Sequence, residues 1–100
     1  MLKLLDGLID ISNFKLFQTI ETEDIIRINQ FYINIKDRNR GIGSHEMKKI
    51  TEYADQVGKD IILYATSSKN KRFYRRHGFQ NSPEDCFIGC NMRRKKYGNG

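Results

Sequence analysis

The sequence predicts a single mixed α/β (α+β) domain over residues 1–100, and three features lead to that prediction. Two stretches of strand composition, residues 14–20 and 25–36, flank a polar turn, which is typical of an antiparallel hairpin. An amphipathic helix and a mostly apolar stretch at residues 60–66 follow, and together they have the length of one β-α-β unit. With 38% hydrophobic and 30% charged residues, the chain has the composition of a folded domain rather than of a disordered segment.

The long strand over residues 25–36 changes its pattern near the middle. Its apolar side chains fall first on even and then on odd positions: Ile26, Ile28, Phe31, Ile33 and Ile35. Because neighbouring residues of a strand face opposite sides of a sheet, one extra residue near Asn29 and Gln30 is needed to keep one face buried. The pattern therefore predicts either a β-bulge at this point or two separate strands.

The helix that follows shows an apolar stripe, and Gly58 is placed to end it in the left-handed conformation. The stripe follows the i, i+3, i+7, i+10 spacing of one helix face: Met47, Ile50, Ala54 and Val57. The outer face is expected to carry the polar side chains Glu46, Lys48, Lys49, Glu52 and Asp55. Residues 60–66 are typical of a buried parallel strand, which a right-handed crossover would place beside the hairpin.

The two ends of the chain carry less regular patterns. Residues 1–13 fit either a short strand or an irregular edge. Residues 69–77 have helical composition and stop at Gly78. Residues 86–92 predict the final strand, and the basic residues that follow predict a mobile tail over 93–100.

The net charge of +6 is concentrated in the last third of the chain. Residues 1–65 carry a net charge of −1, whereas residues 66–100 carry +7. The excess is typical of a solvated face with a basic tail, but it also fits an anionic partner such as a phosphorylated cofactor, a nucleic acid or an acidic protein. No apolar run approaches the roughly 20 residues of a membrane span, so no membrane partner is expected.

The cysteines do not indicate a disulfide framework or a metal site. On one strand, Cys86 and Cys90 would lie about 13 Å apart, too far to form a bridge. Their spacing from His45 and His77 matches no zinc motif, so we expect no metal. Two reduced thiols in a cytoplasmic protein are the expected state.

A glycine-containing loop between the long strand and the helix carries the clearest chemical signal. The start of a helix presents unpaired N–H groups and the positive end of its dipole, and glycines at 41 and 43 leave room for a phosphate there. Arg38 and Arg40 add charge, and Ser44 adds a hydroxyl. The alternative is a tight turn that uses glycine for conformation alone. Glu46 stands where a dinucleotide fingerprint has glycine, and no Gly-Lys-Ser/Thr of a P-loop follows.

Two linked motifs resemble those of the GCN5-related N-acetyltransferase (GNAT) family. The loop matches its Gln/Arg-x-x-Gly-x-Gly/Ala pattern from Arg38 to Gly43, and the second motif runs Phe73-Tyr-Arg-Arg-His-Gly-Phe79. The resemblance covers roughly residues 25–92. It implies a mixed sheet with an N-terminal antiparallel hairpin, splayed parallel strands around the helix, a short helix and a C-terminal strand.

The resemblance also implies acetyl-CoA as the co-substrate and names the residues that would bind it. Backbone groups of Ile33 and Ile35 would pair with the pantetheine arm. The pyrophosphate would lie against the loop residues Arg38, Arg40, Gly41, Ile42, Gly43 and Ser44. Tyr74 would protonate the departing CoA thiolate as a general acid, although a purely packing role is the alternative.

The sequence departs from the family pattern at the acid-base positions. Ser67 stands where many members have asparagine; Asn70 either replaces that cofactor contact or caps the helix over residues 69–77. Many members place a general-base glutamate on the splayed strands, but residues 31–36 and 61–65 contain no carboxylate. The nearest carboxylates by sequence are Glu21, Glu23 and Asp24. Two hypotheses stay open: water carries the proton away from the acceptor amine, or the protein is catalytically inactive.

The short chain resembles acetyltransferases encoded by phages and mobile elements. Only 13 residues precede Phe14, whereas the family has a strand and two helices there, so we expect an open acceptor side that suits a protein amine. A homodimer is the expected cover for the apolar surface this leaves. Two other hypotheses stay open: a basic module that binds nucleic acid through residues 69–76 and 93–96, and an inactive family member that binds proteins.

Overall fold

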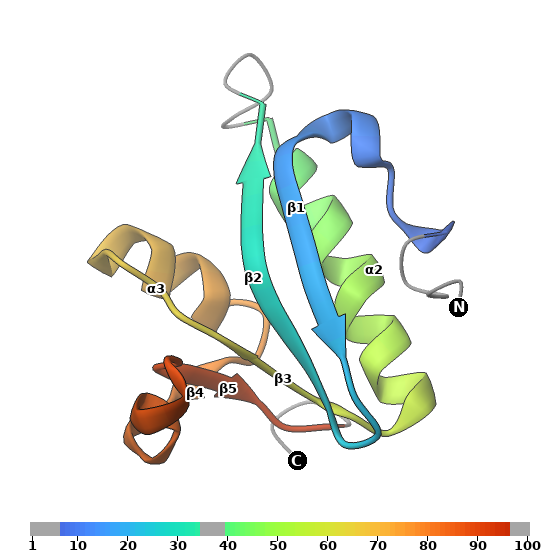
Figure 1. The fold of residues 1–100 in the computed structure, drawn as a ribbon. Helices are drawn as coiled ribbons and strands as arrows, with labels where there is room; N and C mark the ends of the chain where they lie inside the picture. The colour runs from blue at the N-terminus through green and yellow to red at the C-terminus, as the bar shows by residue number, and fades with distance from the viewer. Residues whose placement is uncertain (1–6, 35–39, 97–100) are drawn as a thin grey trace.

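An antiparallel hairpin forms one edge of the sheet, as the sequence predicts. The structure is a computed structural model that describes residues 7–34 and 40–96. A short 3-10 helix, η1 (Ile11–Asn13), leads into strand β1 (Phe14–Glu21), which pairs antiparallel with strand β2 (Ile25–Ile33) (Figure 1). The polar turn between the two strands is therefore confirmed. Of the segment before β1, the described residues 7–13 form no strand: residues 7 and 8 are helical, and residues 11–13 form η1.

A β-bulge interrupts β2 where the sequence pattern changes. Gln18 pairs with Gln30 and the next residue, Thr19, pairs with Ile28, so Asn29 is the extra residue. The bulge reverses the side-chain alternation of β2 and keeps its apolar residues on the core side both before and after it. The predicted bulge is confirmed, and one continuous strand replaces the alternative of two.

The central β-α-β unit is also confirmed. Helix α2 (Ile42–Val57) ends at Gly58, which has a φ of 69°, and strand β3 (Asp60–Leu63) then pairs parallel with β2. This parallel ladder runs as far as the pair formed by Ile28 and Leu63. β2 continues beyond that pair, so the two strands diverge immediately after the last paired residues.

Four further elements complete the chain and extend the sheet. They are helix α3 (Ser68–Arg75), strand β4 (Gln80–Asn81), the 3-10 helix η3 (Pro83–Ile88) and strand β5 (Met92–Arg94). The strand order is β1-β2-β3-β5-β4, and β5 runs antiparallel to both β3 and β4 (Figure 1). None of the helices in the described ranges is long and apolar enough to cross a bilayer.

The prediction of a strand over residues 86–92 is wrong except for its last residue. The apolar run lies in η3 instead, which has Pro83 at its start and ends at Gly89 with a φ of 83°. Phe87 is 88% exposed, so its side chain contributes nothing to a sheet face. Composition alone misassigns this segment because it does not record which side chains point to solvent.

The predicted mobile tail over residues 93–100 is also wrong for its first two residues. Arg93 and Arg94 lie in β5, and each is held by acidic side chains from earlier elements. Arg93 Nη1 lies 2.7 Å from Asp60 Oδ2, and its Nε lies 2.9 Å from Asp85 Oδ2. Arg94 Nη1 lies 2.9 Å from Asp55 Oδ1. These two guanidinium groups therefore tie the last strand to the fold, and part of the C-terminal charge excess is neutralised internally.

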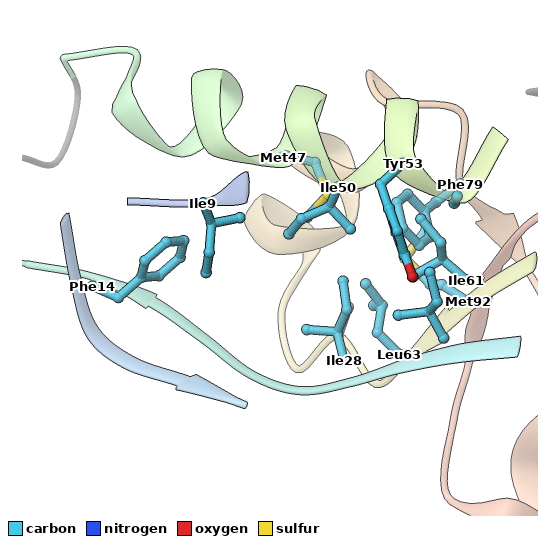
Figure 2. Packing of buried hydrophobic residues seen from close by; sticks show 13 residues of the cluster. Ile9, Phe14, Ile28, Met47, Ile50, Tyr53, Ile61, Leu63, Phe79 and Met92 are labelled. Atoms are coloured by element: carbon cyan, nitrogen blue, oxygen red, sulfur yellow. The ribbon is translucent and has the colours of Figure 1, made fainter. Parts of the chain in front are cut away.

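The core lies between α2 and the sheet (Figure 2). Met47, Ile50 and Ala54 are fully buried there, as the helical stripe predicts. Val57, the fourth member of the stripe, is 38% exposed because it stands at the end of the helix. From the sheet, Ile26, Ile61 and Leu63 pack against this face of α2, and each fully buried side chain of this size is worth about 1.5–3 kcal/mol.

Glu46 does not lie on the outer face of α2, where the helical pattern places it. Its side chain is fully buried (0% exposed) beneath the segment that precedes β1. One carboxylate oxygen accepts a hydrogen bond from the Asp10 N–H at 2.8 Å, and the other accepts one from Asn13 Nδ2 at 3.2 Å. Lys49 Nζ lies 3.1 Å away and balances the charge. Glu46 thus fastens the N-terminal segment to α2, a contact that links residues too distant for a helical pattern to reveal.

Candidate functional site

A cavity of about 740 Å³ opens where β2 and β3 diverge. Four segments line it: β2 beyond the end of the ladder, the turn that leads into α2, the end of β3, and α3. The side chains and glycines that bear on function are Asn29, Tyr32, Ile33, Gly41, Gly43, Ser44, Tyr64, Thr66, Lys69, Asn70, Arg72, Phe73, Tyr74 and Arg76. The bulge residue Asn29 belongs to this lining, next to the point where the ladder between β2 and β3 ends.

The start of α2 forms the electropositive end of this cavity. Its N-cap is Gly41, no side chain among the described residues caps its first N–H groups, and the first turn holds no acidic residue. Gly41 has a φ of 78°, a conformation that glycine adopts without strain. Free N–H groups and the helix dipole favour an anion at this position. The start of α2 (residues 41–44), which we call the phosphate cradle, is therefore suited to an anion, and its phosphate-binding role stays a prediction.

Gly43 lies where α2 meets α3 and β2. A Cβ atom at this position would lie 3.6 Å from Ile33 Cγ1 and 3.6 Å from the Phe73 ring, which is ordinary van der Waals contact. The glycine is therefore not required by crowding. Phe73 is half-buried and packs against the core, so the helix start, the strand and α3 are in direct contact around this glycine.

Ser44 is connected to the end of α3 through His77. The Nε2 atom of His77 lies 3.3 Å from Ser44 Oγ, and the centroid of its ring lies 5.0 Å from that of Phe73, with the two planes tilted by 55°. Burial lowers the pKa of His77, and the nearby charges of Arg76 and Arg94 lower it further. The imidazole is therefore neutral at pH 7 and available to orient the serine hydroxyl.

Tyr74 stands on α3 with its ring against Phe73 and Phe79. The ring centroids lie 5.3 Å and 5.5 Å away, respectively. The side chain is half-buried and lines the cavity. Burial raises the pKa of Tyr74 to about 12, and the neighbouring Tyr32 phenol contributes to the increase. The phenol is therefore protonated throughout the physiological pH range and can donate a hydrogen bond into the cavity.

Asn70 lines the cavity, whereas Ser67 caps α3. The Oγ of Ser67 accepts a hydrogen bond from the Asn70 N–H at 3.1 Å, which satisfies one of the free donors at the helix start. The Asn70 amide donates instead to Thr66 Oγ1 at 3.5 Å. The alternative in which Asn70 caps the helix is therefore wrong, and its side chain faces the site.

The site also contains a row of cations that the sequence prediction missed. Lys69, Arg72 and Arg76 recur at i, i+3 and i+7 and line the cavity from one end of α3 to the other. This spacing is visible in the sequence, where the same charges fit either a solvated face or an anionic partner. No carboxylate stands among the described residues that line the cavity, so its electrostatic character is positive.

The structure brings most of the predicted site residues together. Those that share the cavity are Ile33, Gly41, Gly43, Ser44, Asn70 and Tyr74. Arg40 and Ile42 belong to the same turn but do not line the cavity. Ile35 and Arg38 lie outside the described residues.

The carboxylates that are nearest by sequence do not line the cavity. Glu21 stands at the opposite end of the hairpin from the cavity, where it accepts a hydrogen bond from Tyr53 Oη at 2.7 Å and forms an ion pair with Lys59 at 2.7 Å. Glu23 and Asp24 are exposed in the hairpin turn. Within the described part of the chain, no three His, Cys, Asp or Glu side chains are grouped as metal ligands.

Comparisons with known proteins agree with this geometry. Residues 8–79 match the model of the Acetyltransferase (GNAT) family. An uncharacterized N-acetyltransferase of Methanocaldococcus jannaschii is 33% identical over 64 residues, which are 61% of this chain and 28% of the relative. The chain therefore matches less than a third of that relative's length.

Two solved structures share the fold. The anti-CRISPR protein AcrVA5 superimposes with a TM-score of 0.59 and 26% identity, over 77% of this chain and 85% of that protein. Ard1 from Thermoplasma volcanium superimposes with a TM-score of 0.63 and 19% identity, over 80% of this chain and 61% of that protein. The match over residues 8–79, the β-α-β unit and the cavity between its strands together place this chain in the GNAT acetyltransferase family.

Proposed function

We propose that this protein transfers an acetyl group from acetyl-CoA to an amine on a protein acceptor. The observation that carries the proposal is the divergence of β2 and β3 after Ile28 and Leu63, which opens a cavity beside the start of α2. A cavity of about 740 Å³ is within the usual range for small-molecule and cofactor sites. A phosphate cradle stands at one end and a phenol donor on α3 lines the side, which matches the needs of a long phosphorylated thioester.

The donor would lie along the gap between the strands. Its pantetheine arm would meet the backbone of β2 near Ile33, where a neighbouring strand would otherwise pair. Its pyrophosphate would accept hydrogen bonds from the N–H groups at the start of α2, with the Ser44 hydroxyl beside them. Phe73 contacts both regions and would hold them at a fixed separation.

Tyr74 would assist departure of the thiolate. The acceptor amine attacks the thioester carbonyl, the C–N bond forms, and the C–S bond breaks as the tetrahedral intermediate collapses. Tyr74 donates its proton to the leaving sulfur, and the amine nitrogen loses the proton that it no longer needs. Because the pKa of Tyr74 is raised to about 12, its phenolate is a strong base that recovers a proton from that nitrogen, directly or through water. The two proton transfers, to the sulfur and from the nitrogen, then balance without a carboxylate.

The acceptor would approach past two exposed aromatic side chains. Tyr32 is 49% exposed and Tyr64 is 62% exposed, and both belong to the lining of the cavity. Exposed tyrosines that combine an apolar ring with a polar end are common in surfaces that bind proteins. The likeness to an anti-CRISPR protein, which covers 85% of that protein, also favours a macromolecular acceptor.

A thermal melt with and without acetyl-CoA tests donor binding. At a ligand concentration of 100 times Kd, binding stabilises a protein by about 2.7 kcal/mol, which raises the Tm of a domain of this size by roughly 10–20 °C. Absence of a shift at millimolar acetyl-CoA would refute the proposal.

Tyr74→Phe tests the catalytic role with little change in packing. The variant keeps the ring contacts with Phe73 and Phe79, so stability and acetyl-CoA affinity should change little. Loss of a general acid should lower kcat about 100-fold or more, measured as thiol release with a lysine peptide as acceptor. Unchanged turnover would remove Tyr74 from the mechanism. Tyr64→Phe provides a matched control: loss of this phenol at the rim should change at most the KM for the acceptor and leave kcat unchanged.

A further inference from the structure

Helix α3 carries a cationic charge that no acidic side chain in the described residues neutralises. The ion pairs of the described chain use the cations Lys49, Lys59, Arg93 and Arg94, and none of them lies on α3 or at its C-cap. Five cations nevertheless crowd this short segment: Lys69, Lys71, Arg72, Arg75 and Arg76. Like charges at this spacing repel one another, so an anion bound to this surface would relieve the repulsion.

Arg76 is the cation with the best defined position near the phosphate cradle. Its guanidinium lies over the ring of Phe73, with Cζ 5.9 Å from the ring centroid. The same ring contacts the position of the Gly43 Cβ at 3.6 Å, and the next residue, His77, reaches Ser44. One aromatic ring therefore separates the Arg76 guanidinium from the start of α2.

We propose that Arg76 binds the ribose 3′-phosphate of coenzyme A and makes the enzyme discriminate against donors that lack it. This inference rests on the proposed function and adds a specificity determinant to it. The cation lines the cavity, lies over the aromatic ring that contacts the start of α2, and has no carboxylate partner among the described residues. The planar guanidinium presents paired N–H donors that match the oxygens of a phosphate.

Arg76 is suited to bind the 3′-phosphate rather than the pyrophosphate. The pyrophosphate is accommodated by the N–H groups at the start of α2, where Gly41 and Gly43 leave the backbone accessible. The ribose phosphate is a separate monoester a few covalent bonds away and carries a charge between about −1.5 and −2 at neutral pH. A second cationic site next to the cradle is therefore needed for it, and Arg76 is exposed at that place.

The test compares acetyl-CoA with 3′-dephospho-acetyl-CoA by isothermal titration calorimetry at constant, low ionic strength. A charge-assisted hydrogen bond to phosphate corresponds to a preference of about 10- to 100-fold, so the unmodified protein should bind acetyl-CoA at least about tenfold more tightly. Arg76→Ala should bring the two affinities within about threefold of each other, mainly by weakening acetyl-CoA.

Arg75→Ala is the matched control because it removes the same charge from the neighbouring position. Arg75 donates from Nη2 to Asn81 Oδ1 at 3.2 Å and is not part of the cavity lining, so its variant should keep the preference. Equal binding of the two donors by the unmodified protein would overturn the inference and leave the proposed function standing. An equal loss of preference in both variants would also overturn it. Binding of neither donor would overturn the proposed function and the inference with it.

Discussion

The two glycines at the start of α2 should respond to alanine in opposite directions. Gly41 has a φ of 78°, where an L-residue is strained, although a Cβ there would meet no atom within 4 Å. Gly43 has no such φ, and its Cβ would make ordinary contacts at 3.6 Å with Ile33 and Phe73. Backbone conformation therefore decides how Gly41→Ala changes the free energy of unfolding. Helix propensity and packing decide it for Gly43→Ala.

The expected magnitudes follow from these two geometries. Gly41→Ala should cost about 1–2 kcal/mol for the left-handed conformation, partly offset by about 0.4–1 kcal/mol from the smaller entropy of the unfolded chain. Gly43→Ala should stabilise the protein by about 0.5–1 kcal/mol, because alanine is the better helix former. A change of 1 kcal/mol moves the Tm of a domain of this size by about 4–8 °C, so the two variants should differ in Tm by roughly 10 °C.

Circular dichroism melts, followed by acetyl-CoA titration, separate these effects. Gly43→Ala should keep its donor affinity within about threefold, in agreement with a family motif that permits glycine or alanine at this position. Gly41→Ala should weaken donor binding, because the first N–H groups of α2 must shift to relieve the strain. A lower Tm for Gly43→Ala, or an unchanged Tm for Gly41→Ala, would refute the reasoning.

Three further predictions concern stability and pH. Glu46→Ala removes the buried acceptor of the Asp10 N–H and of Asn13 Nδ2 and should cost about 2–3 kcal/mol in urea denaturation; a loss below about 1 kcal/mol would contradict the role given to this carboxylate. The hydrogen bonds from Arg93 hold the pKa of Asp85 below its usual value, so its stabilising effect is present above about pH 4 and disappears as the pH falls through the folded-state pKa. Asp85→Asn should therefore be less stable than the unmodified protein at pH 7 and approach it in acid, as equilibrium unfolding across pH will show. Because no carboxylate lines the described cavity, kcat/KM for a lysine acceptor should rise about tenfold per pH unit from pH 6.5 to 9; a plateau near pH 7 would reveal an enzyme base.

The elements that the sequence predicts well are those set by local patterns. The hairpin, the bulge at Asn29 and the helix that ends at Gly58 all follow from alternation, periodicity or a glycine signal within a few neighbouring residues. The phosphate loop and Tyr74 were found in the same way, because their motifs are short and contiguous. The structure brings them to one cavity, which the spacing along the chain suggests but does not by itself establish.

The errors occur where distant segments decide the environment of a residue. Arg93 and Arg94 look like a solvated tail until Asp60, Asp85 and Asp55 are brought beside them. Glu46 looks like a surface residue until the segment before β1 covers it. In both cases a charged side chain is buried because an opposite charge or a set of donors reaches it from elsewhere, and single-sequence periodicity contains no record of that partner.

The bulge at Asn29 implies that chain length, rather than side-chain chemistry, sets which side chains of β2 face the core beyond this point. Without this one residue, β2 would keep a single alternation, and Phe31 and Ile33 would turn away from the core side of the sheet. Substitutions at this exposed position should therefore be tolerated, because the extra backbone unit remains. Deletion of Asn29 would do what no point substitution can: it would reverse the side of the sheet on which every later residue of β2 lies.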